Sequence, residues 1–376
     1  MNVREADRPL RVLQIIGGMN AAGAESRLME LYRALDRDQV QFDFLVFHDS
    51  VADYEPEILS LGGTVIHIPH KNIVRFAWRL FRLIRKRRYH VVDCSVLYFS
   101  GISLMIAKWA KVRKRVFHIH NTEDDRRTTI CRSAYRMLMM RLILRYSTDI
   151  VGVSKAVLRR WFGEEWRLKP LVCLRYNGLD INPYKCKADP VWLRQEFSIP
   201  QNFDVVIHVG RFNRQKNHLK LTEIAIKYIA RFPNTCFLLV GDGPLRAKIE
   251  EIVRDSTLSS WFRFAGVRSD VPMLLKSVDA LLFPSLFEGL PGVIQEAVAA
   301  GLPMVTSDLP EIREVLEACE SSAEMLNVDV PGEQWVMPLK RAVDTPKHEE
   351  WLNQFEDSPF SVKNALNKLI KIYGIH

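Results

Sequence analysis

A repeated unit constrains this chain more than any other feature: a short apolar run, a turn, and then a helix-like segment. The runs are typical of buried strands and lie at residues 10–16, 42–47, 64–68, 91–94, 115–119, 149–153, 205–209, 236–240 and 278–283. Strands that alternate with helices predict an α/β fold, in which helices cover both faces of a parallel sheet. Ligands of such sheets bind at the carboxyl ends of the strands, so we expect a site among the turns after these runs.

The length of the chain predicts more than one domain. It has 376 residues, which exceeds the usual size of a single domain. Prolines at 183, 190 and 200 indicate a linker in the region 181–200. The predicted domains are residues 1–183 and 190–358.

The stretch 283–303 combines the end of a strand, a tight glycine-containing loop and a helix. Gly289 and Pro291 lie where the helix begins, so unpaired N–H groups and the positive end of the helix dipole should face the strand end and favour a phosphate. Glu288 and Glu296 flank this point, where carboxylates suit the neutral hydroxyl groups of a sugar or a ribose. On their spacing alone, a capped helix with one solvated glutamate is the simpler interpretation.

A second loop carries two cations. The run 205–209 is followed by GRFNRQKN, so Arg211 and Lys216 leave the same strand end. Two fixed cations there could hold a diphosphate and neutralise it as it departs. The motif alone fits a solvated basic loop equally well, and Arg214 is a further cation to which we assign no role.

Together these motifs resemble a known family. FEGLPGVIQEAVAAGLP and the Gly-Arg-x4-Lys element resemble the donor site of the family-4 retaining glycosyltransferases, which have the GT-B fold. The resemblance implies that Glu288 contacts the donor sugar, that Glu296 holds the ribose, and that Arg211 and Lys216 hold the diphosphate. The donor-binding set then comprises Gly17, Gly18, Gly23, Glu25, Gly210, Arg211, Lys216, Gly241, Val267, Arg268, Glu288, Gly289, Leu290, Pro291, Gly292 and Glu296.

The first glycine-rich loop supports the same resemblance. GGMNAAGAES follows the run 10–16 and is similar to the first loop of these enzymes, with Ala24 in place of one of two adjacent glycines. It is not a GxGxxG motif, and no suitably placed acidic residue follows, so a NAD-dependent oxidoreductase is disfavoured.

Two histidines close the run 115–119. His120, in HIHN, matches the histidine that the family places beside the donor sugar, and it joins Arg211, Lys216 and Glu288 as a predicted catalytic residue. His118 and His120 are expected to point to opposite faces of the sheet. On that basis only one of them can serve, and a shared metal is disfavoured.

The resemblance also implies an architecture and a mechanism. Two Rossmann-like domains would present parallel sheets to a common cleft, the second domain binding the donor and the first the acceptor. A terminal helix at 359–376 would cross back to the first domain. The departing phosphate would accept the proton of the acceptor hydroxyl, with retention of configuration. No metal or other cofactor is expected, since the loop cations and the helix N-terminus supply positive charge.

The implied partners are a nucleotide-sugar donor, with uridine the family's common nucleotide, and a glycan or lipid-linked acceptor in cell-surface polysaccharide synthesis. The net charge is +9, and the whole basic excess lies before residue 181. Segments 71–88, with eight basic residues, and 126–145 mix Arg with apolar residues, which is typical of surface helices that rest on anionic lipid. A polar N-terminus and six scattered cysteines favour a cytoplasmic protein, peripheral on the inner face of the membrane.

Two other functions fit the composition less well. A sugar-nucleotide epimerase of related fold would need acid and base carboxylates and histidines, and no such set is identified. A basic nucleic-acid-binding protein would need a recognised binding motif, whereas the phosphate loops recur in the acidic half of the chain. We therefore expect no nucleic acid partner.

Overall fold

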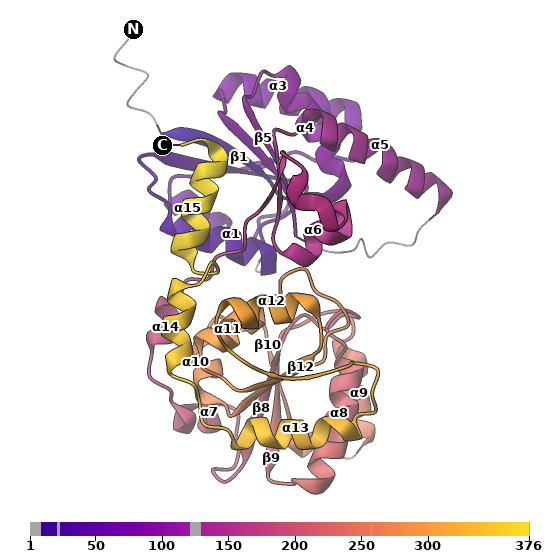
Figure 1. Cartoon of the computed structure of the whole chain (residues 1–376), viewed down its shortest axis with the longest axis vertical. Helices are drawn as coiled ribbons and strands as arrows, with labels where there is room; N and C mark the ends of the chain where they lie inside the picture. Colours follow the sequence, from indigo (N-terminus) through magenta and orange to yellow (C-terminus); the bar gives the residue numbers. More distant parts are fainter. Residues whose placement is uncertain (1–8, 21–22, 121–128, 257, 376) are drawn as a thin grey trace. The chain divides into compact units, whose positions relative to one another are not determined.

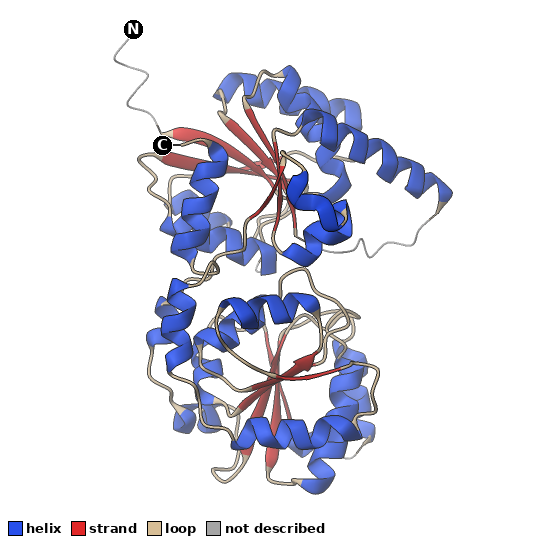
Figure 2. Ribbon diagram, viewed as in Figure 1, coloured by secondary structure: helices blue, strands red, loops and turns tan. Residues whose placement is uncertain are grey.

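The computed structural model describes residues 9–20, 23–120, 129–256 and 258–375. The chain forms two compact units, one made of Met1–Gly178 with Val362–His376 and the other of Leu179–Ser361. Each unit is built on one parallel sheet with helices on both faces, which is the predicted α/β class (Figures 1 and 2). The first unit therefore includes the C-terminal helix.

The sheet of the first unit has seven parallel strands in the order β3-β2-β1-β4-β5-β6-β7. The order reverses at the β1/β4 pair, where loops after both strands meet at the carboxyl edge. The sequence did not predict β7, a three-residue edge strand of half-buried side chains. The strands are β1 Leu10–Ile15, β2 Val40–Val46, β3 Thr64–His67, β4 Val91–Cys94, β5 Lys114–Ile119, β6 Asp149–Gly152 and β7 Val172–Leu174.

Helices α1 and α15 cover one face of this sheet, and α3, α4 and α5 cover the other (Figure 1). The first face buries Tyr32, Phe42 and Leu369 in one apolar cluster. Helix α1 begins at Gly23, before the predicted start near Ser26, and the Ser26 hydroxyl lies 2.8 Å from the Tyr54 hydroxyl. The helices are α1 Gly23–Ala34, α2 Glu55–Ser60, α3 Ile73–Arg87, α4 Ser100–Trp109, α5 Ile130–Tyr146, α6 Lys155–Phe162 and α15 Val362–Tyr373.

The sheet of the second unit has six parallel strands in the order β10-β9-β8-β11-β12-β13, and its order reverses at the β8/β11 pair. The sequence did not predict β12, or β13 and α13 in the stretch 317–345. The strands are β8 Asp204–Val209, β9 Thr235–Val240, β10 Phe262–Gly266, β11 Ala280–Phe283, β12 Met304–Ser307 and β13 Glu324–Leu326. The helices are α7 Pro190–Glu196, α8 His218–Arg231, α9 Arg246–Asp255, α10 Val271–Ser277, α11 Gly292–Ala299, α12 Pro310–Ala318, α13 Glu333–Asp344 and α14 Glu350–Asp357.

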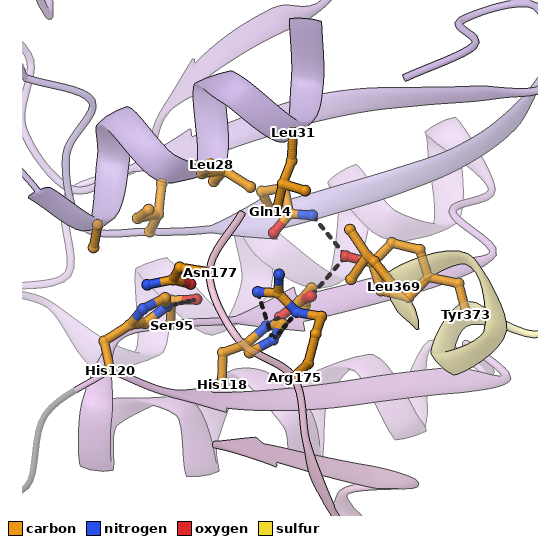
Figure 3. Close-up of a pocket in the computed structure, with 13 residues that line it drawn as sticks. Gln14, Leu28, Leu31, Ser95, His118, His120, Arg175, Asn177, Leu369 and Tyr373 are labelled. Carbon is orange, nitrogen blue, oxygen red and sulfur yellow. Dashed lines mark hydrogen bonds and ion pairs between the residues drawn. The ribbon is translucent and has the colours of Figure 1, made fainter. Parts of the chain in front are cut away.

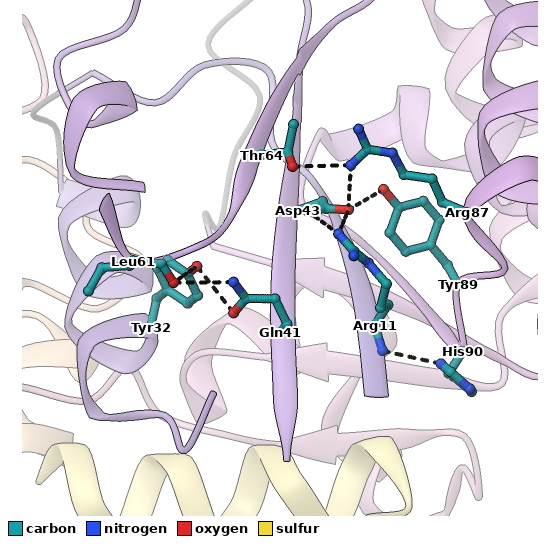
Figure 4. A network of polar contacts seen from close by, with 9 residues as sticks. All are labelled: Arg11, Tyr32, Gln41, Asp43, Leu61, Thr64, Arg87, Tyr89 and His90. Atoms are coloured by element: carbon teal, nitrogen blue, oxygen red, sulfur yellow. Dashed lines mark hydrogen bonds and ion pairs between the residues drawn. The ribbon is translucent and has the colours of Figure 1, made fainter. Parts of the chain in front are cut away.

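A buried carboxylate lies in the middle of β2 (Figure 4). Asp43 is fully buried and accepts hydrogen bonds from Arg11 Nη2 at 2.6 Å, Arg87 Nη1 at 3.0 Å and the Tyr89 hydroxyl at 2.5 Å. A buried charge is tolerated when it is paired and fully hydrogen-bonded, as it is here. Arg87, which belongs to the basic segment 71–88, therefore has a structural partner.

The two basic segments form helices α3 and α5 in the described part of the chain. Helix α3 exposes Val74 and Trp78 beside its arginines, and Arg82 stacks over the Trp78 ring at 4.7 Å. The segment 126–145 starts within residues 121–128, which lie outside the described residues, as does Asn121 of HIHN. None of the helices that the structure describes has the length and apolar character needed to cross a bilayer.

Candidate active site

The reversal of strand order in the second unit brings two loops together. Because β8 pairs with β11, the loop 210–217 lies beside the loop 284–291 at the carboxyl edge of the sheet. The N–H of Leu286 donates to the carbonyl oxygen of Gln215 at 2.9 Å, which joins the two loops directly. This is the position at which open parallel sheets bind their ligands.

Lys216 and Glu288 meet at this point. Lys216 Nζ lies 2.7 Å from Glu288 Oε1 and 4.7 Å from the centre of the Phe283 ring. Gln215 Nε2 donates to the other carboxylate oxygen at 3.0 Å. Glu288 is buried, so this pair of donors compensates its charge. The sequence did not identify Gln215, although it lies in the same motif as Lys216.

Arg211 and Arg268 differ in their surroundings. Arg211 is exposed, and its guanidinium has no hydrogen bond or ion pair with any residue that the structure describes, so it can accept an anion from solvent. Arg268 already pairs with Asp270 at 2.6 Å and with Glu196 at 3.0 Å. Its neighbour Val267 is exposed. The more accessible positive charge of the two is therefore that of Arg211.

The glycines of the β8 and β9 loops allow close backbone packing. A Cβ on Gly241, whose φ is +129°, would lie 2.2 Å from the carbonyl oxygen of Gly210. A Cβ on Gly210 would lie 3.1 Å from Cγ of Lys216, so the lysine side chain runs across this glycine. The N–H of Gly210 donates to the carbonyl oxygen of Val240 at 2.9 Å. Both glycines thus shape the loop that carries Lys216.

Helix α11 follows the Glu288 loop. It begins at Gly292, with Pro291 as the N-cap residue rather than within the first turn as predicted. Gly289 is buried, Leu290 is half-buried, and Glu296 lies half-buried about one turn into the helix. The N-terminus of α11 therefore opens at the carboxyl edge of β11, as the sequence predicts, and the backbone N–H groups of its first turn supply partial positive charge there.

A further carboxyl group belongs to this region and was missed by the sequence reasoning. Glu311 lies in the first turn of α12, after β12, and only 7% of its surface is exposed. Burial, and then the negative charges of Glu288 and Glu314, raise the pKa of Glu311 to about 7. A glutamate after Pro310 at the start of a helix is usually solvated, so the sequence held no sign of this burial.

The predicted donor residues of the N-terminal half lie in the first unit. Gly17, with a φ of +35°, and Gly18 follow β1, while Gly23 and Glu25 open α1. A Cβ on Gly18 would lie 3.3 Å from Nε2 of His48, so the turn is close-packed. Residues 21–22 of this loop lie outside the described part. Contact of these residues with the donor stays a prediction.

His118 and His120 line one pocket of the first unit, and the prediction that they point to opposite faces is wrong (Figure 3). Side chains along a strand alternate, so residues two apart share a face. Their ring centres are 5.7 Å apart. Burial, followed by the nearby His118 and Arg175, lowers the pKa of His120 to about 3, so its imidazole is neutral at neutral pH. Over the described residues, no three His, Cys, Asp or Glu side chains group as metal ligands would.

Comparison with known proteins decides the family. Residues 22–170 match the family described as "Glycosyl transferase 4-like domain", and residues 204–331 match "Glycosyl transferases group 1". The putative glycosyltransferase EpsF of Bacillus subtilis (strain 168) is 31% identical over 374 residues, which cover 97% of this chain and 96% of EpsF. The chain belongs to this glycosyltransferase family. A second relative of the glycosyltransferase is the capsular polysaccharide biosynthesis glycosyltransferase CapH of Staphylococcus aureus, 26% identical over 97% of this chain and 98% of CapH.

Solved structures agree on the fold of the glycosyltransferase. Anabaena HepE in complex with UDP superposes with a TM-score of 0.80 at 19% identity, over 97% of this chain and 99% of HepE. WaaG, a glycosyltransferase involved in lipopolysaccharide biosynthesis, superposes with a TM-score of 0.72 at 15% identity, over 95% and 99% of the two chains. At these identities the likeness concerns the fold alone. The predicted family and the GT-B fold class are confirmed.

Proposed function

We propose that this glycosyltransferase moves a sugar from a UDP-sugar to a glycan or lipid-linked acceptor in cell-surface polysaccharide synthesis, with retention of anomeric configuration. One observation supports the proposal most directly: at the reversal of strand order, Lys216 forms an ion pair with the buried Glu288, and the same loop carries the exposed Arg211. CapH, a capsular polysaccharide biosynthesis glycosyltransferase, supports the polysaccharide, and HepE, whose structure was solved in complex with UDP, supports the nucleotide.

The pair suggests how the donor is received. Without a ligand, the Lys216 ammonium and the Glu288 carboxylate neutralise each other at 2.7 Å. A diphosphate that enters between Arg211 and α11 offers the ammonium a second anionic partner, which frees Glu288 to accept hydrogen bonds from sugar hydroxyls. These cations and the helix N-terminus stabilise the leaving diphosphate, so the proposed reaction requires no divalent cation. Glu296 is assigned to the ribose.

The proposed proton transfer does not use His120 as an acid. The pKa of His120 lies far below neutrality, so the side chain serves as a neutral hydrogen-bonding group towards a sugar hydroxyl. The departing phosphate takes the proton of the acceptor hydroxyl as the new glycosidic bond forms. The donor is assigned to the second unit and the acceptor to the first.

The first unit also suggests where the enzyme works. Helix α3 exposes Val74 and Trp78 next to Arg75, Arg82 and Arg85, a combination that suits a surface of anionic lipid. We assign the enzyme to the cytoplasmic face of the membrane, where a lipid-linked acceptor would be presented to it.

Nucleotide-dependent stabilisation tests the proposal. UDP, GDP and ADP and their sugars are added to the purified chain and the melting temperature is measured. A ligand at 100 times its Kd adds about 2.7 kcal/mol to the free energy of unfolding, so the shift should be several degrees for UDP. Arg211→Ala should fold normally and lose most of the shift. Arg214→Ala is the matched control, since Arg214 is exposed on the same loop. If no nucleoside diphosphate stabilises the chain, the proposal is withdrawn.

A further inference from the structure

The described part of the first unit contains a small cavity at the carboxyl edge of its sheet (Figure 3). Leucines of α1 and α15 form one wall. The opposite wall is polar and carries Ser95, His120 and Asn177, of which Ser95 Oγ lies 3.4 Å from His120 Nε2. Nδ1 of His120 is buried and has no hydrogen-bond partner among the described residues. The polar wall therefore includes a buried ring nitrogen whose hydrogen-bonding capacity no described residue uses.

Other buried side chains that line the same cavity are joined by a chain of hydrogen bonds. Arg175 donates to His118 Nε2 from Nε at 3.3 Å and from Nη2 at 3.2 Å. A guanidinium can only donate, so Nε2 is the acceptor nitrogen and the ring proton lies on Nδ1. That proton is donated to Asp93 Oδ1, 2.8 Å away. The chain thereby fixes one tautomer of a neutral His118.

The far end of the chain comes from the C-terminal helix. The Tyr373 hydroxyl donates to Asp93 Oδ2 at 2.6 Å and accepts from Gln14 Nε2 at 2.9 Å. Asp93 and Tyr373 are 280 positions apart in the sequence. The other end of the hydrogen-bond chain is Arg175. It also donates to the carbonyl oxygen of Tyr176 at 3.2 Å, and Asn177 of the polar wall is the next residue.

Stability alone does not account for this arrangement. The Tyr373 ring already packs edge-on against Phe42 at 6.3 Å in the apolar cluster, and phenylalanine would pack there equally well. A buried chain of charged groups is often no more stabilising than apolar residues of the same volume. What the hydroxyl adds is a fixed position for Asp93 and, through it, for His118 and Arg175.

We propose that Tyr373 is a positioning residue for the reaction: through Asp93, His118 and Arg175 it holds the wall in which His120 and Asn177 meet the sugar. This inference rests on the proposed function for its effect on activity. The terminal helix thus completes the site of the first unit as well as its core.

The test compares Tyr373→Phe with Tyr89→Phe. The Tyr89 hydroxyl also donates to a buried carboxylate, Asp43, in the same unit, but it lies outside the cavity. Each variant loses one hydrogen bond to a buried carboxylate, and Tyr373→Phe also loses the bond from Gln14, so Tyr373→Phe should lose somewhat more stability. Tyr373→Phe should lower kcat for UDP release from the donor about tenfold or more, with KM for the donor little changed, while Tyr89→Phe keeps kcat.

A spectroscopic measurement separates this inference from the proposed function. In protein labelled with ¹⁵N-histidine, proton–nitrogen correlation spectra should show His118 as the Nδ1–H tautomer. Tyr373→Phe should shift the ring signals of His118 and His120, and Tyr89→Phe should leave them in place. Unmoved signals, or equal loss of kcat in both variants, would overturn the inference. If wild type transfers no sugar at all, the proposed function fails and the ring signals alone decide the positioning role.

Discussion

Replacing Glu311 with glutamine should stabilise the second unit above neutral pH and have little effect in acid. The pKa of the Glu311 carboxyl is raised from its ordinary 4.5 to about 7, first by burial. Below pH 4.5 the group is protonated in both the folded and the unfolded chain. Between 4.5 and 7 only the folded chain keeps the proton, so the free energy of unfolding falls as the pH rises. Above pH 7 the loss in the free energy of unfolding is complete and no longer changes with pH.

The magnitude follows from the two pKa values. A difference from 4.5 to about 7 corresponds to about 3 kcal/mol at high pH, since one pKa unit is worth about 1.4 kcal/mol. Glutamine is uncharged at every pH, like the protonated acid, so its gain over the wild type should approach this value at high pH. The gain should vanish towards pH 4.5.

Urea unfolding of the wild type and of Glu311→Gln at pH 5, 6, 7 and 8 measures this difference directly. Glu317→Gln is the matched control, because Glu317 lies on the same helix but is exposed. The control should show no such trend with pH. A difference between wild type and Glu311→Gln that does not grow from pH 5 to pH 7 would refute the argument that burial and the neighbouring carboxylates hold the proton on Glu311.

Three other predictions concern separate parts of the molecule. Glu288→Gln removes the ionic partner of Lys216, so UDP should bind as well or better in calorimetric titration, while transfer falls about a hundredfold or more. Asp43→Asn leaves two arginines without their shared anion and should lower the free energy of unfolding by about 2–4 kcal/mol in urea, with UDP affinity unchanged. The exposed basic residues of α3 are Arg75, Arg82, Arg85 and Lys86. Their exchange for glutamine should weaken the binding free energy to anionic vesicles by about 1 kcal/mol per charge, so less protein should sediment with the vesicles. Unchanged sedimentation would exclude α3 as the lipid contact.

Most of the strands that the sequence predicts have buried side chains, although the half-buried edge strand β3 was also predicted and the buried strand β12 was missed. Strand β2, for example, is buried along its whole length, and its apolar residues were recognised as a strand although Asp43 lies among them. Two edge strands were missed, because they are short and their side chains are only partly buried: β7 and β13 have three half-buried residues each. Their pairing is decided by the neighbouring strand and not by their own composition.

The pocket that His118 and His120 line shows a different limit of prediction from the sequence. The sequence identified His120 but dismissed His118 through an error in strand geometry, and it gave no sign of Arg175 or Tyr373 as their partners. The two histidines, Arg175 and Tyr373 come from three separate parts of the chain, so their meeting depends on the order of the strands and on the return of α15 to the first unit. A buried arginine carries no local signal, since arginine is usually exposed.

The donor loops lie between these two cases. The motif around Arg211 and the motif around Glu288 could each be recognised alone, yet each also fitted an ordinary solvated loop. Their contact depends on the pairing of β8 with β11, which are separated in the chain by two other strands and brought together where the winding of the sheet reverses. Once that pairing is known, a lysine and a glutamate 72 residues apart lie 2.7 Å from each other, and the solvated-loop interpretation no longer fits the buried Glu288. The chemistry of each motif is thus local, whereas its surroundings are set by the topology of the whole unit.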